Sequence, residues 1–598
     1  MTSGYPVPLA RHSNCLAPPV HFSAGDMERE MRAVAVKIHN FRSIHDAAIR
    51  LEPLSLIAGA NNAGKSNIID AIRLFYGDLK WDESRDAPKV TPPDTESWIE
   101  VEFLPTDGEL TQLKDNYKAA SGTFRVRNYV SPSVGTDGKT RAGYYAYENG
   151  ALSESLFYGA KNVGSGKIGH IVYIPAVSRI DDNTKLSGPS VLRDLIGEIL
   201  NKVVADSHAY RDLKEAFGAF EGSIKSQTSN DGQSLALLEK EVTDEIAGWD
   251  ASFALAIQSV QPEDILKTLI KPQLTDETHG GEIDQARFGA GFQRHLVYTL
   301  ITLAAKHANP PRAMLSGQKE FTPQLMWILF EEPEAFLHPS QEEVLHDSLL
   351  KLVRDGATQV LLTTHSSRFV SRSMDDLTRL IRLRRDDGVT TVYQLSQHEL
   401  DSLFDEALVS DSTITPIGTT DTDVNMAAMM ASLKTELWMQ STRTTAFFSD
   451  RVILVEGPSE VALYTYLTTR GVMQPPTRGL AVIDCMGKYN IHRFVALLSA
   501  FGIDHSVVYD GDGGRAHDAE VTSAITKARS SFTKRVTRFG EDLEAELGIG
   551  RLRRDDEHRK PQYVLYHLES GAVDPGKLEA VKQEFVSLAT DTGGAPDA

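Results

Sequence analysis

The feature that most constrains the fold is a glycine-rich loop between an apolar strand and a helix. Residues 59–66 read Gly-Ala-Asn-Asn-Ala-Gly-Lys-Ser, which fits the pattern G-x-x-x-x-G-K-[ST]. The strand-like segment 54–57 precedes the loop, and apolar residues at helical spacing follow it, namely Ile68, Ile69, Ile72 and Phe75. This setting favours a phosphate-binding loop in an α/β fold over an ordinary glycine turn.

Each residue type in this loop has a physical reason to be there. Glycines let backbone N–H groups approach phosphate oxygens, and Lys65 supplies a mobile cation for the β and γ oxygens. Ser66, at the start of the helix, can bind Mg²⁺. We therefore expect ATP to be bound by Gly59, Asn61, Asn62, Gly64, Lys65 and Ser66.

Downstream, the apolar run 325–330 ends in Glu331-Glu332-Pro333-Glu334. Acidic residues after a strand are more often a solvated strand end, but a preceding phosphate-binding loop reverses that preference. Glu331 is then expected to bind Mg²⁺ through water and Glu332 to polarise the attacking water. His365 follows another apolar strand and could sense the γ-phosphate, although a lone histidine is usually structural.

The second half has a different organisation. Apolar segments at 452–455, 480–484 and 506–509 alternate with helical patterns that begin near 459 and 490. Such alternation is typical of a compact, doubly wound α/β unit.

Two acidic sets follow strands of this unit. Segment 452–455 leads into Glu456-Gly457-Pro458-Ser459-Glu460, and segment 506–509 leads into Asp510-Gly511-Asp512. Open α/β sheets place their sites at these carboxyl ends of strands. Hard oxygen ligands gathered there would bind Mg²⁺ or Mn²⁺ and leave room for a phosphodiester. Either acidic set alone is a weak signal, and the pair in this order is far more specific.

Charge and length exclude some classes of protein. The chain has 598 residues and a net charge of −20, which weighs against a generally cationic nucleic-acid binder but leaves room for a local basic groove. Basic residues gather late in the chain (Lys527, Arg529, Lys534, Arg535, Arg538, Arg551, Arg553, Arg554 and Arg559). They alternate with acids such as Glu541, Asp542, Glu544 and Glu546, which favours a solvated helical surface over a DNA track for most of them.

Two cysteines, the lack of a long apolar run and the lack of a signal-like start favour a cytoplasmic protein without membrane contact. The predicted division is a disordered tail (1–30), a first ATPase part (31–185), a helical insertion (186–250), a second ATPase part (251–400), a connection (401–446), the doubly wound domain (447–588) and a disordered tail (589–598).

The motif order of the first half resembles the ABC-type ATPases of the RecF/SMC/Rad50 group. The resemblance rests on residues 40–42, the phosphate-binding loop, the glycine-rich segment 289–294, the acidic set at 331–334 and His365. It implies that Gly289, Gly291 and Gln293, with Arg294, complete the ATP site of a second protomer. The segment lacks the serine of the usual signature, and Glu331 stands where Asp is commoner; both departures argue against fast ATP turnover.

The acidic pair of the second half resembles a Toprim domain. Together with the join at 447–450 and Gly487-Lys488, it resembles the OLD (overcoming lysogenization defect) family, in which Toprim follows an ABC ATPase, as in Gabija-type nuclease subunits. The resemblance implies an ATP-regulated DNA endonuclease, often in phage defence. It also implies a homodimer or higher oligomer formed through the helical insertion, and a possible helicase or other defence partner.

Site roles carry over residue by residue. Glu456, Asp510 and Asp512 would hold metal, and Glu460 would complete a second metal site or act as a base. Gly457 would allow close approach of the backbone, and Lys560 would stabilise charge on the scissile phosphate.

Two other interpretations stay open. The chain could be a non-cleaving, ATP-gated DNA-binding, repair or sensor protein, although the full set of four carboxylates argues against it. Alternatively, it could be a nuclease in which ATP is a structural ligand. A topoisomerase is disfavoured because no domain that would present a catalytic tyrosine is visible and Tyr509 lies in the strand beside the acids.

Overall fold

The computed structural model describes residues 31–176, 227–255, 325–405 and 441–590, with short gaps in each range, and a few short segments between 212 and 303. The gaps are 93, 135–137, 158–162, 164–167, 247, 249–250, 336, 355–357, 371–373, 476–478 and 512–517. The predicted N-terminal tail, most of the helical insertion and most of the connection therefore lie outside the described residues. Within the insertion, Leu238, Val242 and Ile246 belong to helix α7 (Leu235–Ile246).

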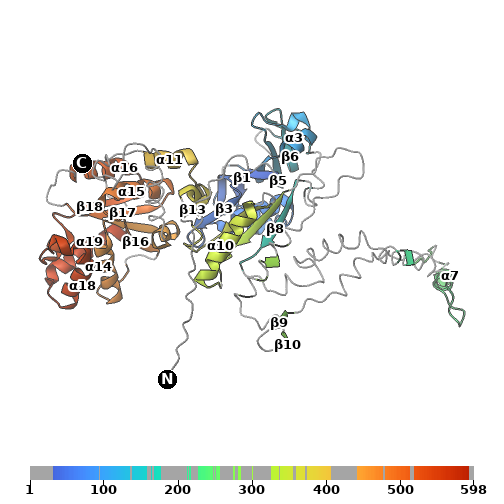
Figure 1. Ribbon diagram of the computed structural model, residues 1–598. Helices are drawn as coiled ribbons and strands as arrows, with labels where there is room; N and C mark the ends of the chain where they lie inside the picture. Colours follow the sequence, from blue (N-terminus) through green and yellow to red (C-terminus); the bar gives the residue numbers. More distant parts are fainter. Residues whose placement is uncertain are drawn as a thin grey trace, which may run out of the picture.

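The N-terminal half contains two six-stranded sheets (Figure 1). The first is an antiparallel sheet in the order β2-β1-β4-β5-β6-β7. Its strands are β1 (Arg32–Phe41), β2 (Ile44–Arg50), β4 (Trp98–Leu104), β5 (Phe124–Val134), β6 (Thr140–Glu148) and β7 (Ala151–Leu152). Short helices α2 (Glu83–Asp86) and α3 (Asp107–Gln112) lie in its connections.

The second sheet, in the order β14-β13-β3-β12-β11-β8, carries the phosphate-binding loop. Its strands are β3 (Leu54–Gly59), β8 (His170–Ile174), β11 (Met326–Glu331), β12 (Thr358–Thr363), β13 (Leu380–Asp386) and β14 (Val389–Tyr393), and only the edge strand β14 runs antiparallel to its neighbour. Parallel pairing places the carboxyl ends of β3, β12 and β11 at one edge. The predicted nucleotide residues follow those three strands.

Helix α1 (Lys65–Tyr76) follows the loop, as its apolar spacing predicts. Ile68, Ile69, Ile72 and Phe75 are all buried, in a cluster shared with the antiparallel sheet. Helices α10 (Pro339–Arg354) and α11 (Gln397–Asp405) follow β11 and β14 in the chain. A separate two-stranded pair is formed by β9 (Leu274–Asp276) and β10 (Gly281–Ile283).

The C-terminal unit is a four-stranded, all-parallel sheet in the order β16-β15-β17-β18. Its strands are β15 (Arg451–Val455), β16 (Leu480–Asp484), β17 (Asp504–Tyr509) and β18 (Thr533–Arg538). Its helices are α13 (Ser441–Thr444), α14 (Pro458–Thr469), α15 (Ile491–Ala500), α16 (Asp518–Ala528), α17 (Leu543–Leu547), α18 (Lys560–Glu569) and α19 (Pro575–Thr590). Helix α19 extends two residues into the predicted tail, and its Ala589 is buried.

Alternation along β15 explains why this sheet is covered on both faces. Val452 and Leu454 pack into one buried cluster with residues of α15 and α16. Ile453 and Val455 pack into another cluster with residues of α14, α18 and α19. Successive side chains of a strand point to opposite faces, so both faces of β15 are apolar and both are covered. The predicted doubly wound arrangement is confirmed.

The two halves share a hydrophobic core. One buried cluster contains Leu54 and Leu56 of β3 together with Phe447, Val452 and Phe501 of the C-terminal unit. Figure 1 shows that unit, in orange and red, beside the sheets of the N-terminal half, with β13 at the junction.

Arg382 of β13 is the polar centre of this junction. It is 3% exposed, and its guanidinium donates hydrogen bonds to the carbonyl oxygens of Phe447 (3.2 Å), Ser449 (3.2 Å), Phe501 (3.0 Å) and Gly502 (3.1 Å). The first two carbonyls precede β15, and the other two follow α15. A buried charge is tolerated when its donors are paired, and here four backbone acceptors pair them.

Candidate nucleotide and metal sites

The phosphate-binding loop connects β3 to α1 in a conformation that only glycine adopts easily at position 64. Gly64 has φ +104°, and a Cβ added there would lie 2.7 Å from the Oγ1 of Thr390. Asn61, Asn62 and Ser66 are exposed, so the mouth of the loop is open to a ligand. Asn62 also has a positive φ of 67°.

Lys65 lies inside the loop. Its Nζ donates to the carbonyl oxygens of Gly59 and Ala60, both at 3.0 Å. Burial lowers the pKa of Lys65 to about 8, against the opposing effect of Glu332 and Glu334. Anionic phosphate oxygens would favour its charged form, so nucleotide binding and protonation of this lysine are coupled.

Glu331, Glu332 and His365 meet at the same edge. Strand β12 lies between β3 and β11, so His365, just beyond β12, lies between the loop and the acidic set. His365 Nε2 is 3.3 Å from Glu332 Oε1, and Glu332 has φ +43°. Glu331 accepts a hydrogen bond from the Tyr173 hydroxyl (3.0 Å). The predicted residues are therefore brought together around the loop.

Glu334 also belongs to this site, although its motif gave it no separate predicted role. Burial raises the pKa of its carboxyl, and its Oε1 accepts the backbone N–H of His365 at 2.6 Å. It also contributes to the field at Lys65. Its proximity to the other acids in Glu-Glu-Pro-Glu was the only available signal. Gly289, Gly291, Gln293 and Arg294 lie outside the described residues.

The acidic residues of the C-terminal unit also meet at a sheet edge. Glu456 follows β15 and Asp510 follows the adjacent β17, and the Asp510 N–H donates to Glu456 Oε2 at 3.2 Å. Glu460, in the first turn of α14, accepts the N–H of Gly457 at 3.0 Å. Asp512 lies outside the described residues.

Burial and mutual repulsion shape the protonation of these acids. Burial raises the pKa of Asp510 to about 8, with further contributions from Glu460 and Glu456. Burial likewise raises the pKa of Glu460 to about 7, with a contribution from Glu456. Like-charged carboxylates held out of water resist ionisation until a cation joins them.

Lys560 and Glu544 complete the group. Lys560 Nζ is 3.3 Å from Glu544 Oε1, and Glu544 is 1% exposed. Burial acts to lower the pKa of Lys560, but Glu544 and Asp510 raise it above its ordinary value. The alternation of acids and bases around Glu544 predicts a solvated surface, and this prediction is wrong for Glu544, because its side chain on α17 is buried beside Lys560.

The donors suit a divalent cation in chemistry but do not form a finished cage. Among the described residues, no three His, Cys, Asp or Glu side chains are arranged to hold a metal ion. However, Asp510 Oδ1 is buried without a hydrogen-bond partner among the described residues. An unpaired, buried carboxylate oxygen is an acceptor that a hard cation would satisfy. The residues present therefore fit Mg²⁺ or Mn²⁺.

This architecture defines a phosphate-binding-loop ATPase joined to a parallel α/β domain with an acidic strand edge. A family model described as AAA ATPase domain matches residues 31–125 and 109–370. A second model, described as overcoming lysogenization defect protein-like, TOPRIM domain, matches residues 447–512. The chain belongs to the AAA ATPase domain family and carries an OLD-like Toprim domain.

Curated relatives extend the similarity over most of the chain. It is 26% identical over 503 residues to the Old nuclease of Escherichia phage P2, covering 81% of this chain and 77% of that protein. It is 23% identical over 578 residues to the OLD nuclease of Thermus scotoductus (92% and 97%). It is 23% identical over 496 residues to the endonuclease GajA of Bacillus cereus (81% and 75%). These matches confirm the resemblance to the OLD family and place the chain among Toprim proteins with an ATPase domain whose named relatives are nucleases.

Proposed function

We propose that this chain is an ATP-regulated, divalent-metal-dependent DNA endonuclease. The observation that carries the proposal is the group formed by buried Glu460 and Asp510 with half-buried Glu456, beside Lys560 and at the carboxyl edge of a parallel sheet. The names of the relatives support cleavage of nucleic acid by such a domain.

The chemistry follows from the environments of these groups. A bound Mg²⁺ or Mn²⁺ would supply an activated water and neutralise charge on the phosphodiester. Glu456 and Asp510, with Asp512, are the proposed ligands, and Glu544 is an additional candidate on the same edge. Glu460, with a pKa of about 7, is suited to accept the proton of the attacking water, and Lys560 to stabilise the charge that develops on phosphate.

In the ATPase half, we propose that Lys65 binds the β- and γ-phosphates, and that Ser66 and Glu331 hold the nucleotide's Mg²⁺. Glu332 would polarise the attacking water, and His365 would report the γ-phosphate. Gly289, Gly291 and Gln293 of one protomer would complete the ATP site of another, in a homodimer or higher homo-oligomer.

The test is cleavage of supercoiled plasmid by the purified chain in Mg²⁺ or Mn²⁺, with and without ATP. We expect nicking or linearisation that Asp510→Ala abolishes and that Glu579→Gln, a change at an exposed surface carboxylate of α19, leaves intact. Persistence of cleavage in Asp510→Ala at saturating metal would contradict the proposed site. The lanes with ATP give the sign of nucleotide control.

A second candidate function is a non-cleaving, ATP-gated DNA-binding or sensor protein. The observation that favours it is the lack of a ready three-ligand metal group among the described residues. Intact plasmid under all conditions, combined with nucleotide-dependent DNA binding, would identify this function instead.

We also propose a cytoplasmic role in anti-phage defence, with a helicase or another defence protein as a possible partner. Support comes from the phage and bacterial relatives of OLD and GajA type. No helix in the part of the chain that the structure describes is long and apolar enough to cross a membrane. Plaque counts on cells carrying wild type or Asp510→Ala would test the role in defence.

A further inference from the structure

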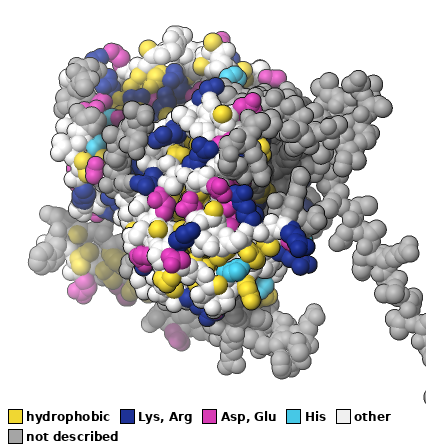
Figure 2. Space-filling view, turned by 90° about the vertical axis from the view of Figure 1, so that its left-hand side faces the viewer, with side chains coloured by type: hydrophobic (Ala, Val, Ile, Leu, Met, Phe, Trp, Pro, Cys, Tyr) yellow, Lys and Arg dark blue, Asp and Glu magenta, His cyan; other side chains and the backbone are white. Residues whose placement is uncertain are grey.

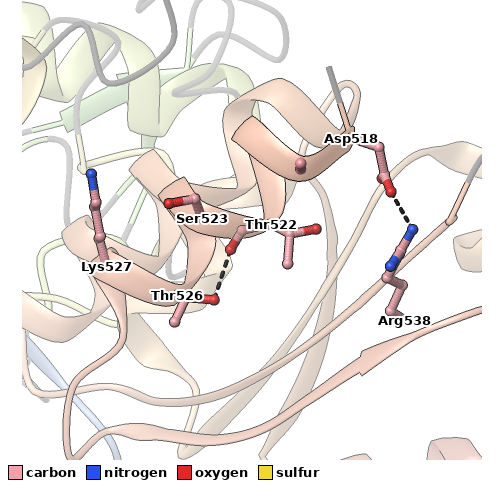
Figure 3. Close-up of a pocket in the computed structure, with 7 residues that line it drawn as sticks. Asp518, Thr522, Ser523, Thr526, Lys527 and Arg538 are labelled. Atoms are coloured by element: carbon pink, nitrogen blue, oxygen red, sulfur yellow. Dashed lines mark hydrogen bonds and ion pairs between the residues drawn. The ribbon is translucent and has the colours of Figure 1, made fainter. Parts of the chain in front are cut away.

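The Toprim sheet carries a polar pocket that the proposed catalytic group does not use. It has a volume of about 530 Å³, within the about 300–1,000 Å³ typical of ligand sites. Helix α16 and strand β18 line it with three hydroxyl side chains, two cations, one carboxylate and Ala519; the polar residues are Thr522, Ser523, Thr526, Lys527, Arg538 and Asp518. Figure 3 shows Lys527 and Arg538 at opposite ends of the row of hydroxyls.

One end of this pocket touches the acidic strand edge. Arg538 donates to the carbonyl oxygen of Gly511 at 3.2 Å, and Gly511 lies directly between Asp510 and Asp512. A hydrogen bond between Tyr509 and Thr522 (3.1 Å) also joins β17 to the helix. A strand of DNA with one phosphate at the acidic edge could therefore continue along α16.

The carboxylate in the pocket is already neutralised. Asp518 is 5% exposed, pairs with Arg538 and lies 3.5 Å from the Nζ of buried Lys488. Two cations thus offset one acid, and Lys527 adds a further positive charge at the other end. The net charge of this lining favours an anion.

The surface around the pocket has mixed charge, so a local group of cations and hydroxyls distinguishes the pocket from its surroundings. Figure 2 looks onto the C-terminal unit, where Lys and Arg side chains are interspersed with Asp and Glu. The whole chain carries a net charge of −20, so attraction to DNA cannot come from overall charge. Contacts to the DNA backbone must come from places such as this pocket, where hydroxyl and cationic donors gather, and these are the donor types that contact phosphates in protein–DNA complexes.

We propose that this pocket binds a backbone phosphate of the DNA strand that flanks the scissile phosphate. Lys527, Ser523 and Thr526 are the phosphate-contacting residues, and Arg538 links the pocket to the acidic edge. The inference rests on the proposed endonuclease function and adds the path of its substrate. Among the basic residues of this region, Lys527 thus contacts phosphate, whereas others pair with acids, such as Arg535 with Glu584.

The test measures binding of a fluorescent DNA duplex by anisotropy, with Ca²⁺ in place of Mg²⁺, over a series of KCl concentrations. Loss of one lysine–phosphate contact should weaken binding severalfold and reduce the slope of log Kd against log salt by about 1. We expect this result for Lys527→Ala, and retention of both values in Lys527→Arg. Lys582→Ala on α19, outside the pocket, is the matched control and should match wild type.

A salt slope in Lys527→Ala equal to that of Lys582→Ala would overturn the proposal. A competition arm with inorganic phosphate and with a nucleoside monophosphate tests the source of the phosphate. If either one saturates the pocket while the salt slope of DNA binding is independent of Lys527, the pocket is a small-anion site and the DNA path is wrong.

The plasmid assay separates this failure from failure of the proposed function. If wild type cleaves plasmid in an Asp510-dependent manner but Lys527→Ala keeps the wild-type slope, only the pocket assignment fails. If wild type neither binds the duplex nor cleaves plasmid, both assignments fail.

Discussion

At the residue scale, two buried acids of the Toprim domain have raised pKa values. Asp510 and Glu460 are buried, and burial together with neighbouring carboxylates raises their pKa values to about 8 and about 7. In an unfolded chain the same groups are solvated and ionise in acid. Near neutral pH, the folded protein without metal therefore holds protons on these carboxyls, and unfolding would release them.

This difference predicts a pH-dependent stability. A carboxyl whose folded-state pKa is raised stabilises the folded state fully only below its unfolded value, and loses that contribution as pH rises through the folded value. In EDTA, the free energy of unfolding should fall between about pH 4 and pH 8, by at most about 1.4 kcal/mol per pH unit for one group. Asp510→Asn should flatten this slope in denaturant titrations across that range. Equal slopes for the variant and wild type would show that Asp510 ionises normally in the folded state.

Added Mg²⁺ or Mn²⁺ should have the opposite dependence on pH. Metal binding requires carboxylates, so it must displace the proton of Asp510, and affinity should rise as pH increases toward about 8. The measurement is the metal-induced shift in Tm at several pH values. Asp510→Asn should lose most of the shift, whereas Glu579→Gln should keep it.

In the nucleotide site, Glu332→Gln should separate binding from hydrolysis. The glutamine keeps the size of the side chain beside His365 but cannot polarise water as a carboxylate does, so steady-state phosphate release should fall by about 10²-fold or more. Binding of a fluorescent ATP analogue should persist in Glu332→Gln and be lost in Lys65→Ala. Undiminished phosphate release in Glu332→Gln would assign the attacking water to another residue.

At the element scale, the hairpin of β13 and β14 contacts both halves of the molecule. Leu383 of β13 pairs with Gly59, and Thr390 of β14 donates to the Ala63 carbonyl of the phosphate-binding loop at 2.9 Å. Arg382 of the same hairpin donates hydrogen bonds to four backbone carbonyl oxygens of the Toprim unit, and Arg384 forms an ion pair with Asp504. One short hairpin therefore connects the phosphate-binding loop to the starts of β15 and β17.

Arg382→Met tests the contribution of this contact. Arg382 is 3% exposed, and this burial lowers its pKa to about 10, with a contribution from Arg384. Its removal would leave four buried carbonyls with one acceptor site each unpaired, and we expect a loss of about 2–4 kcal/mol in the free energy of unfolding. Urea denaturation followed by circular dichroism measures it. Arg385→Gln, at an exposed position of the same strand, should cost less than about 0.5 kcal/mol.

Sequence patterns predicted these elements unequally. Apolar runs predicted β3, β11, β12, β15, β16 and β17. Strands buried on both faces are continuous in apolar residues, and all of these except the half-buried edge strand β16 are buried over most of their length. The β13–β14 hairpin has no such pattern, because segment 380–386 contains three arginines and an acid and is typical of a solvated strand.

The candidate sites likewise contain some residues that the sequence predicted and others that it did not. Among the described residues, the acids that follow β11, β15 and β17 lie at sheet edges, because parallel pairing brings strand ends together. Glu544 and Arg382 were missed, since an acid among surface charges and an arginine in a strand give no sign in sequence that tertiary packing will bury them.

At the scale of the whole molecule, the shared core has an energetic consequence. Leu54 and Leu56 of the ATPase sheet and Phe447 and Phe501 of the Toprim unit belong to one buried cluster. Unfolding either half alone would expose the apolar face of the other, at about 25 cal/mol per Å² of apolar surface. The two halves should therefore unfold together.

Scanning calorimetry tests this cooperativity. We expect one main transition for wild type, and a broadened or divided transition for Phe501→Ala, because that change opens a cavity at the junction. Leu568→Ala, in the separate cluster on the other face of the Toprim sheet, is the comparison and should lower the transition temperature without dividing the transition. Two well-separated transitions in wild type would contradict a shared core.

The β13–β14 hairpin also determines where such a chain can be recombined with its relatives. A chimera cut in the connection after residue 405 would carry one parent's Arg382 against another parent's carbonyls at 447–449 and 501–502. Exchange of the Toprim unit together with the hairpin would instead disturb Leu383 and Thr390 at the phosphate-binding loop. The two halves must therefore come from parents whose hairpin contacts are compatible. Functional hybrids should arise only between parents that share the residues of this hairpin and the positions it contacts.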